Sequence, residues 1–252
     1  SLESTYPGSF RPSFLVVEKN IRGKKIQAVE RQAKLLILEL ESGRYLLFHL
    51  KLTGRLLVRP KGQDADDYTR SVFSLQNDKG KLIELRFADA RKFGFVKFIQ
   101  SKKEMDSLLT EYGPEPLKDL DLKKFSQILA KSGQAVKVVL MDQAKISGLG
   151  NIYANDALWL AQINPKRPAR DLKTAEVKKL YQAVLTVLKR GLRYGGASDQ
   201  WYRQVHGEEG EYQKHFLVYG RTGQECGRCK AKIERIVLGG RGTFLCPKCQ
   251  LI

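Results

Sequence analysis

Cys226-Gly227-Arg228-Cys229 and Cys246-Pro247-Lys248-Cys249 decide the fold at the C-terminal end of this chain. Each Cys-x-x-Cys turn points two sulfurs at one centre, and sixteen residues separate the two turns. This length fits a β-hairpin, with strands from Ile233 to Leu238 and from Gly242 to Leu245 and a turn at Gly239-Gly240. Four thiolates so spaced favour one structural, tetrahedral Zn²⁺, whose binding supplies folding energy that a segment of about 30 residues lacks. A redox pair, a disulfide pair and an iron–sulfur cluster are the alternatives.

The charge of the whole chain is strongly basic. The 252 residues include 45 Lys and Arg and 27 Asp and Glu, which gives a formal net charge of +18. Such an excess favours a polyanionic partner, because basic side chains that meet phosphates release condensed counterions. Arg235 and Arg241 place basic groups on the expected hairpin. We therefore interpret the chain as a nucleic-acid-binding protein; a merely solvated basic surface and a membrane-binding patch are the alternatives.

Hydropathy and cysteine placement indicate the compartment. No run of about 18 apolar residues occurs, so we expect no membrane span. Ser1 to Arg11 is polar and contains Pro and Gly, so we expect no signal peptide. All four cysteines lie in the last 27 residues, where thiolates on a metal suit a reducing compartment better than a disulfide framework does.

Roughly the first 100 residues predict β-structure, since short runs of β-formers alternate with turn signals. Strands this close in sequence suggest an antiparallel sandwich or barrel. The polar segment from Pro60 to Asp67 predicts a mobile loop. The expected strands are Phe14 to Val17, Ala28 to Glu30, Lys34 to Leu40, Tyr45 to Leu50, Arg55 to Val58, Val72 to Leu75, Leu82 to Phe87 and Phe93 to Ile99.

After Tyr112-Gly113-Pro114-Glu115-Pro116, which predicts a linker, the apolar period becomes helical. Helices are expected around Leu122 to Leu129, around Val136 to Leu140 and from Asn151 onward. The longest is expected from about Leu172 to Leu192, with Asp171 as its cap and Gly195-Gly196 at its end.

Between two of these helices lies Ser147-Gly148-Leu149-Gly150-Asn151. A Gly-x-Gly turn before a helix can aim backbone N–H groups and the positive end of the helix dipole at a phosphate. The Asn151 side chain can add an uncharged hydrogen bond. Ordinary helix punctuation is the alternative for this element.

Several motifs, in order along nearly the whole chain, resemble one family, the bacterial formamidopyrimidine-DNA glycosylase and endonuclease VIII enzymes of base-excision repair. Leu140 to Ala154 resembles the family's helix–two-turn–helix. The other matching motifs are His49-Leu50-Lys51-Leu52-Thr53-Gly54, Asp89-Ala90-Arg91-Lys92-Phe93-Gly94, Val218-Tyr219-Gly220-Arg221 and the zinc ligands Cys226, Cys229, Cys246 and Cys249.

The resemblance implies roles for individual residues. Lys34 matches a lysine that contacts a phosphate beside the lesion, and Asp156 matches a carboxylate close to the catalytic N-terminus. Leu52, Arg91 and Phe93 match the wedge that fills the gap when the damaged base swings out. The backbone clamp is matched by Lys137, Asn151 and Arg241. The alternatives are core packing for Leu52 and Phe93, a surface ion pair for Arg91 and an exposed helix charge for Asp156.

The start of the chain departs from the family. The family begins with Pro-Glu-Leu-Pro-Glu, whose N-terminal amine is the nucleophile, since a terminal amine has a lower pKa than a lysine. This sequence begins Ser1-Leu2-Glu3-Ser4-Thr5. We expect that a segment preceding Ser1 is omitted. The alternatives are a member that lost catalysis, and an amine such as Lys34 or the Ser1 α-amine that took over.

Specificity is less determined by the sequence. Gly195 to Tyr202 only partly resembles the lesion-recognition loop, Asn164-Pro165 replaces a more usual His-Pro, and Leu52 replaces the usual Met. The preferred lesion and opposite base therefore stay open.

The expected fold class is α+β multidomain. We expect a β-sandwich over 1–110 (N-terminally incomplete), a linker over 111–118, a helix–two-turn–helix domain with the lesion-recognition loop over 119–220 and a zinc finger over 221–252. The resemblance implies a cytoplasmic, nucleoid-associated, monomeric glycosylase and AP lyase. It implies double-stranded DNA as partner and oxidised purines or abasic sites as targets; a non-catalytic damaged-DNA-binding protein is the alternative.

Overall fold

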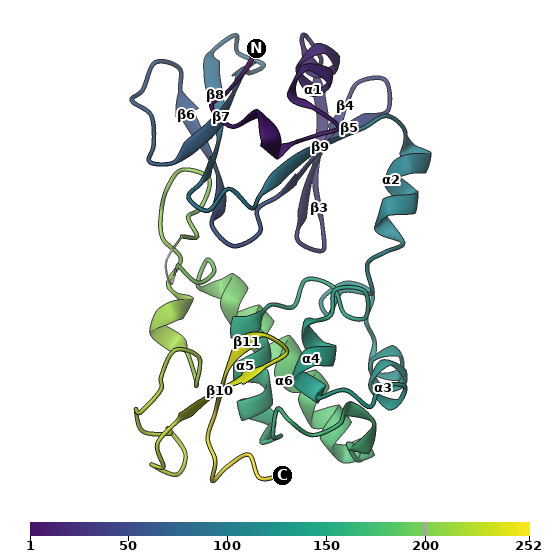
Figure 1. Cartoon of the computed structure of the whole chain (residues 1–252), viewed down its shortest axis with the longest axis vertical. Coiled ribbons are helices and arrows are strands. Elements are labelled where there is room, and N and C mark those ends of the chain that lie inside the picture. The colour runs from purple at the N-terminus through teal and green to yellow at the C-terminus, as the bar shows by residue number, and fades with distance from the viewer. Residues whose placement is uncertain (199–200) are drawn as a thin grey trace. The chain divides into compact units, whose positions relative to one another are not determined.

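Residues 1–198 and 201–252 are described in the computed structural model (Figure 1). The chain divides into two units: Ser1–Thr110 with Gly195–Glu211, and Glu111–Tyr194 with Tyr212–Ile252. In the described residues no helix combines the length and apolarity that a membrane crossing needs. Asp199 and Gln200, in the expected lesion-recognition loop, lie outside the description.

The first unit is a sandwich of two sheets, as expected. One sheet has the strand order β1-β7-β8-β6 and the other β2-β9-β5-β4-β3. Apolar side chains of both sheets share one core, in which the ring of Phe48 lies 5.4 Å from that of Phe73 and 6.2 Å from that of Phe87. The strands are β1 (Leu2–Ser4), β2 (Phe10–Arg11), β3 (Ile26–Gln32), β4 (Leu35–Leu40), β5 (Arg44–His49), β6 (Gly54–Pro60), β7 (Thr69–Gln76), β8 (Leu82–Asp89) and β9 (Phe95–Ile99).

The strand expected at Phe14 to Val17 is wrong, because α1 (Phe14–Ile21) occupies this segment. Ser13 caps the helix, its hydroxyl accepting a hydrogen bond from the Val16 N–H. Phe14, Val17 and Ile21 face the core at helical spacing, while Leu15 is 74% exposed. Tertiary packing at a period of three to four residues overrides the β-propensity of the apolar run.

The segment from Pro60 to Asp67, expected to be a mobile loop, is held in place. The guanidinium of Arg86, only 2% exposed, donates to the carbonyls of Gln63 and Asp64 and to the Asp66 carboxylate. Charge-assisted bonds to a buried arginine therefore fix a polar segment that composition alone describes as free.

The second unit is helical and carries the hairpin. Its core gathers buried apolar side chains from all four helices, including Phe125, Leu140, Leu158 and Val184. The elements are α3 (Leu122–Ala130), α4 (Val136–Met141), α5 (Asn151–Ala161), α6 (Thr174–Arg193), β10 (Glu234–Leu238) and β11 (Arg241–Leu245). A further helix, α2 (Lys102–Leu109), precedes the unit.

Helix α6 begins later than expected, and Asp171 does not cap it. Asp171 ends a short 3-10 turn, Ala169–Asp171, and Lys173 is the N-cap. The Glu176 carboxylate reaches back to accept the Lys173 N–H at 2.8 Å, so a residue inside the first turn satisfies the helix start. The helix ends at Arg193, and Gly195 and Gly196 follow with φ of +65° and +88°.

Candidate nucleic-acid interface

The four cysteines form one cluster, with all four sulfurs within 4.8 Å of one another. The Cys226 and Cys249 sulfurs are 3.9 Å apart, and those of Cys229 and Cys246 are 3.4 Å apart. Zinc–sulfur bonds of about 2.3 Å place the corners of a tetrahedron about 3.8 Å apart. The donor set and its spacing therefore fit one structural Zn²⁺, and the hairpin β10–β11 lies between the two turns, as expected.

Helix α5 sets the position of the zinc cluster. The Trp159 indole N–H donates to the Cys226 sulfur at 3.4 Å. The Arg228 guanidinium lies 4.0 Å from the centre of the Trp159 ring and donates to the Trp159 carbonyl at 2.6 Å. Donors to sulfur and packing around a metal site orient its ligands, so this tryptophan and arginine dock the finger on the helical core.

Asn164, which precedes Pro165, holds the end of the finger. Its amide, 5% exposed, donates to the Gln250 carbonyl at 2.7 Å. The Gln250 side chain donates to the Ile163 carbonyl and accepts the Cys246 N–H, at 2.8 and 2.9 Å. These bonds therefore form a buried polar contact between the helical core and the cluster.

Two of the expected clamp residues converge on the hairpin. The Lys137 ammonium donates to the Gly242 carbonyl at 2.8 Å and to the Thr243 hydroxyl at 2.6 Å, and the Asn151 amide donates to the same carbonyl at 3.1 Å. Arg241, next to that carbonyl, is exposed. Lys137 is fully buried, so the structure places its ammonium inside, supporting the hairpin. Burial, then the charge of Arg241, lowers the pKa of Lys137 to about 8.

Asp156 lies inside the helical unit. Its carboxylate accepts the backbone N–H groups of Leu217, Val218 and Tyr219 at 3.0 to 3.2 Å and the Tyr212 hydroxyl at 3.2 Å. Burial raises its pKa, and the four donors oppose that rise. Both oxygens are occupied in fixing the segment that leads into the finger, so Asp156 is not the exposed helix charge that was the simpler alternative.

Lys34, Lys51 and His49 lie around the turn between β3 and β4. Lys34 is exposed in this turn, next to Leu35, which pairs with His49 on β5. The His49 Nδ1 accepts the Lys51 N–H at 3.0 Å, which leaves Nε2 to carry the proton of the neutral ring. Burial, then the charges of Lys51 and Lys34, lowers the pKa of His49 to about 4. Lys34 therefore lies beside a neutral imidazole that can donate a hydrogen bond.

The three expected wedge residues lie on two loops of the sandwich, β5–β6 and β8–β9. Leu52 is 58% exposed and Phe93 is 52% exposed, so neither belongs to the core. The Arg91 guanidinium lies 4.8 Å from the centre of the Phe93 ring. These exposures contradict the core-packing alternative for the two apolar residues.

One buried carboxylate joins the two wedge loops. Asp89, 2% exposed, accepts the Thr53 hydroxyl and the backbone N–H groups of Arg91 and Gly94. Gly94 is required there, because a Cβ would lie 2.6 Å from the Phe87 ring. The loops are thus braced from below while their tips stay exposed.

Sequence reasoning missed the residues that support this interface. Asn155, 1% exposed, accepts the Phe244 N–H at 2.8 Å and so docks β11 on α5. Thr53, Asp89 and His49 were noticed only as letters of motifs. The signal that could have found them was a polar residue inside an apolar setting beside a glycine turn.

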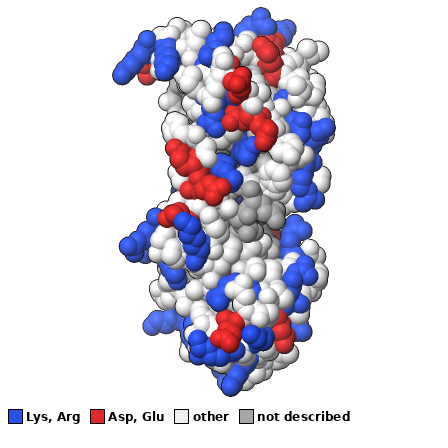
Figure 2. Space-filling view, turned by 90° about the vertical axis from the view of Figure 1, so that its left-hand side faces the viewer, with Lys and Arg blue, Asp and Glu red and all other residues white. Residues whose placement is uncertain are grey.

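Lysines and arginines are spread over the face of the molecule in Figure 2, while acidic side chains gather into a few small groups. This distribution agrees with the net charge of +18 and with a polyanionic partner.

Together, the zinc hairpin, the helix–two-turn–helix and the braced sandwich loops are the features of a zinc-containing DNA-binding protein. Three family models cover most of the chain: the formamidopyrimidine-DNA glycosylase N-terminal domain over 5–96, the formamidopyrimidine-DNA glycosylase H2TH domain over 112–202, and the zinc finger found in FPG and IleRS over 223–252.

Individual relatives agree. A formamidopyrimidine-DNA glycosylase of Herpetosiphon aurantiacus is 42% identical over 231 residues, 91% of this chain and 83% of that protein. Another, of Lactococcus lactis subsp. cremoris, is 35% identical over 255 residues, 99% of this chain and 90% of that protein. This chain belongs to the formamidopyrimidine-DNA glycosylase family, a family of DNA repair enzymes, which confirms the resemblance.

Solved structures match the whole fold. The Lactococcus lactis Fpg in complex with DNA containing an abasic site has a TM-score of 0.90 and 33% identity, over 100% of this chain and 92% of that one. Its complex with Fapy-dG-containing DNA has a TM-score of 0.89 at the same identity and coverage.

Proposed function

We propose that this chain recognises an oxidised purine, such as 8-oxoguanine or a formamidopyrimidine, or an abasic site in duplex DNA. It swings the damaged base out and acts as a glycosylase with associated AP-lyase activity. The observation that carries the proposal is the pair of exposed apolar tips, Leu52 and Phe93, on loops that the buried Asp89 braces. The names of the relatives and the damaged DNA in the matching complexes support it.

Exposed apolar side chains on rigid loops suit the filling of a gap. Extruding a base costs a few kcal/mol of stacking and pairing. Full burial of a Leu or Phe side chain contributes about 1.5–3 kcal/mol, and since each tip is already about half buried, insertion recovers about 1 kcal/mol from each. The Arg91 guanidinium beside Phe93 can hydrogen-bond the orphaned partner base.

The phosphates are contacted from both units in this proposal. Arg241 and Asn151 offer a charge and an amide at the hairpin, and Lys34 offers a charge in the sandwich. Lys137 acts through the hairpin, since its ammonium is buried on Gly242 and Thr243. Asp156 supports the catalytic region indirectly, by fixing residues 217–219.

The excision step of the proposal is that of the family. An amine nitrogen bonds to C1′ of the sugar as the bond from C1′ to the base breaks and the base leaves with a proton. The C1′–O4′ bond then opens, with a proton going to O4′, and gives an imine, which allows β/δ-elimination of the phosphates. The protein acts as a monomer in the bacterial cytoplasm at the nucleoid, which size-exclusion chromatography and fluorescence microscopy can check.

Borohydride trapping tests the enzymatic part. The full-length protein, with whatever segment precedes Ser1, is incubated with a duplex that carries one 8-oxoguanine, and with an undamaged duplex, in the presence of sodium borohydride. The proposal expects a covalent protein–DNA adduct with the damaged duplex alone. Tight binding to an abasic-site duplex with no adduct and no strand cleavage would reject excision and leave a damage-binding protein.

A further inference from the structure

The segment from Tyr202 to Glu209 is docked on the edge of a sheet in the first unit. Strand β6 is the last strand of its sheet, and its Val58 N–H donates to the Val205 carbonyl at 2.8 Å. Pro60, two residues further on, lies on the same side of the strand and has no N–H to offer. Among the described residues, the main-chain bond between this segment and β6 is the one from Val58 to Val205, so a further contact is needed to fix the segment.

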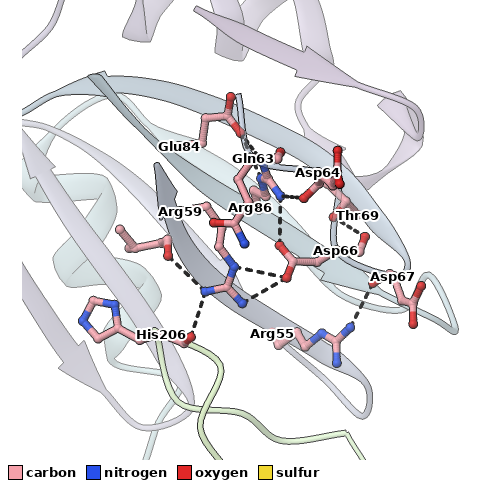
Figure 3. Close-up of polar contacts among 11 residues, drawn as sticks. Arg55, Arg59, Gln63, Asp64, Asp66, Asp67, Thr69, Glu84, Arg86 and His206 are labelled. Carbon is pink, nitrogen blue, oxygen red and sulfur yellow. Dashed lines mark hydrogen bonds and ion pairs between the residues drawn. The ribbon is translucent and has the colours of Figure 1, made fainter. Parts of the chain in front are cut away.

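Arg59 supplies the second attachment (Figure 3). Its guanidinium donates to the His206 carbonyl at 2.9 Å through one nitrogen and to one oxygen of Asp66 at 3.0 and 3.1 Å through the other two. The side chain of Arg59 is only 12% exposed. Gly207 has φ of +104°, and a Cβ there would lie 2.9 Å from the same guanidinium, so glycine is needed for this close approach.

Asp66 is itself held, so the Arg59 guanidinium has a fixed position. The other oxygen of Asp66 accepts from Arg86 at 3.1 Å, and the Arg86 side chain is 3% exposed and paired with Glu84 at 2.7 Å. These groups form one continuous row of charge-assisted bonds from the interior of the sheet to the His206 carbonyl (Figure 3).

The docked segment has its own turn and an aromatic start. The Gln204 N–H donates to the Glu208 carbonyl at 2.8 Å, which closes the turn. Immediately before the segment, the Trp201 ring lies 5.5 Å from the Tyr68 ring. The Tyr68 carbonyl in turn accepts the Asp89 N–H at 3.0 Å. Asp89 is the residue whose carboxylate braces the wedge loops. Trp201 therefore lies at the end of the sheet that carries these loops, whereas Arg59 holds the segment near the other end of β6.

We propose that Arg59 is a positioning residue: it acts as a latch that holds the segment from Tyr202 to Glu209 against β6. This keeps Trp201 and Tyr202 beside the wedge loops, where they can contact an extruded base. This inference rests on the proposed function. Aromatic faces next to the gap are the groups that receive a flipped base. A segment that is already ordered loses less conformational entropy when it meets that base.

The test compares Arg59→Ala with Arg55→Ala. Arg55 lies on the same strand and donates to the Asp67 carbonyl at 2.9 Å, so its removal deletes the same charge without touching the docked segment. Arg59→Lys keeps the charge but has no fork to join Asp66 to His206. Hydrogen exchange at the Val58 amide reports docking, and the affinities for an 8-oxoguanine duplex and an abasic-site duplex report function.

For Arg59→Ala and Arg59→Lys we expect Val58 exchange to accelerate and affinity for the 8-oxoguanine duplex to fall, each roughly tenfold, while abasic-site affinity falls less than twofold. Arg55→Ala should match wild type. Unchanged exchange, or an unchanged ratio of the two affinities, overturns the inference. If the wild type itself does not prefer damaged over undamaged duplex, the proposed function fails, while the exchange measurement still judges the latch.

Discussion

Replacing Asp156 by Asn should destabilise the helical unit strongly, although the change removes a buried charge. Each oxygen of Asp156 accepts two hydrogen bonds, one pair from Val218 and Tyr219 and the other from Leu217 and Tyr212. The amide NH₂ is tolerated best on the side of Leu217 and Tyr212, because the Tyr212 hydroxyl can turn to accept from it, whereas the Leu217 N–H loses its acceptor. A hydrogen bond to a charged acceptor contributes about 1.5–3 kcal/mol and one to a neutral acceptor about 0.5–1.5 kcal/mol, so the lost bond and the two weakened bonds from Val218 and Tyr219 together cost about 3–5 kcal/mol.

Relief of burial offsets part of that loss. Burial raises the pKa of Asp156, which means that burial disfavours its charged form. The neutral Asn side chain does not carry this desolvation cost. We therefore expect a net decrease of about 2–4 kcal/mol in the free energy of unfolding, measured by urea denaturation with the zinc retained. Tyr212→Phe, which removes a single bond to the carboxylate, should cost about 1.5–3 kcal/mol. An Asn variant within about 0.5 kcal/mol of wild type would refute this reading of the carboxylate.

Four further outcomes follow from the interface. Arg241→Ala should reduce the slope of log K against log salt for duplex DNA by about 0.9, one phosphate contact, and a slope that does not move means that Arg241 is only solvated. Cys246→Ser should lower the bound zinc per chain and weaken DNA binding; unchanged zinc content and affinity would contradict the site. Phe93→Ala should weaken binding to an 8-oxoguanine duplex about fivefold, the loss of about 1 kcal/mol of burial, and binding to undamaged duplex much less. Burial lowers the pKa of His49 to about 4, so stability present above pH 6.5 is lost as pH falls towards 4. The free energy of unfolding, measured by urea titration, should fall less between pH 7 and pH 5 in His49→Gln than in wild type, by about 1–2 kcal/mol. The same fall in both proteins would reject this role of His49.

The sequence predicted those features whose physics is local. Cysteine spacing predicts the metal site because two short turns place four sulfurs together, whatever surrounds them. The start of α5 at Asn151 follows from the Gly-x-Gly turn, and the β-hairpin from Gly239-Gly240. The run from Phe14 to Val17 has the composition of a strand but forms a helix, because Ser13 caps it and its buried side chains recur at helical spacing.

Other features depend on partners far along the chain. Lys137 reads as a surface charge until the fold brings Gly242 and Thr243 to its ammonium. Asp156 reads as a helix charge until residues 217–219 turn their N–H groups towards it. The docking of His206 on Arg59 joins residues that are 147 positions apart. No local propensity indicates such pairings, which is why these supporting contacts could not be predicted even where the residue itself was.

Base extrusion with the gap filled by Leu52 and Phe93 is the central claim, and the fluorescence of 2-aminopurine tests it most directly. The probe is placed next to a single 8-oxoguanine in duplex DNA, where stacking quenches it. We expect fluorescence to rise when the wild-type chain binds, and to rise clearly less when the Leu52→Ala, Phe93→Ala double variant binds at saturating concentration. Saturated binding with no rise in fluorescence, or an equal rise with both proteins, would contradict the account.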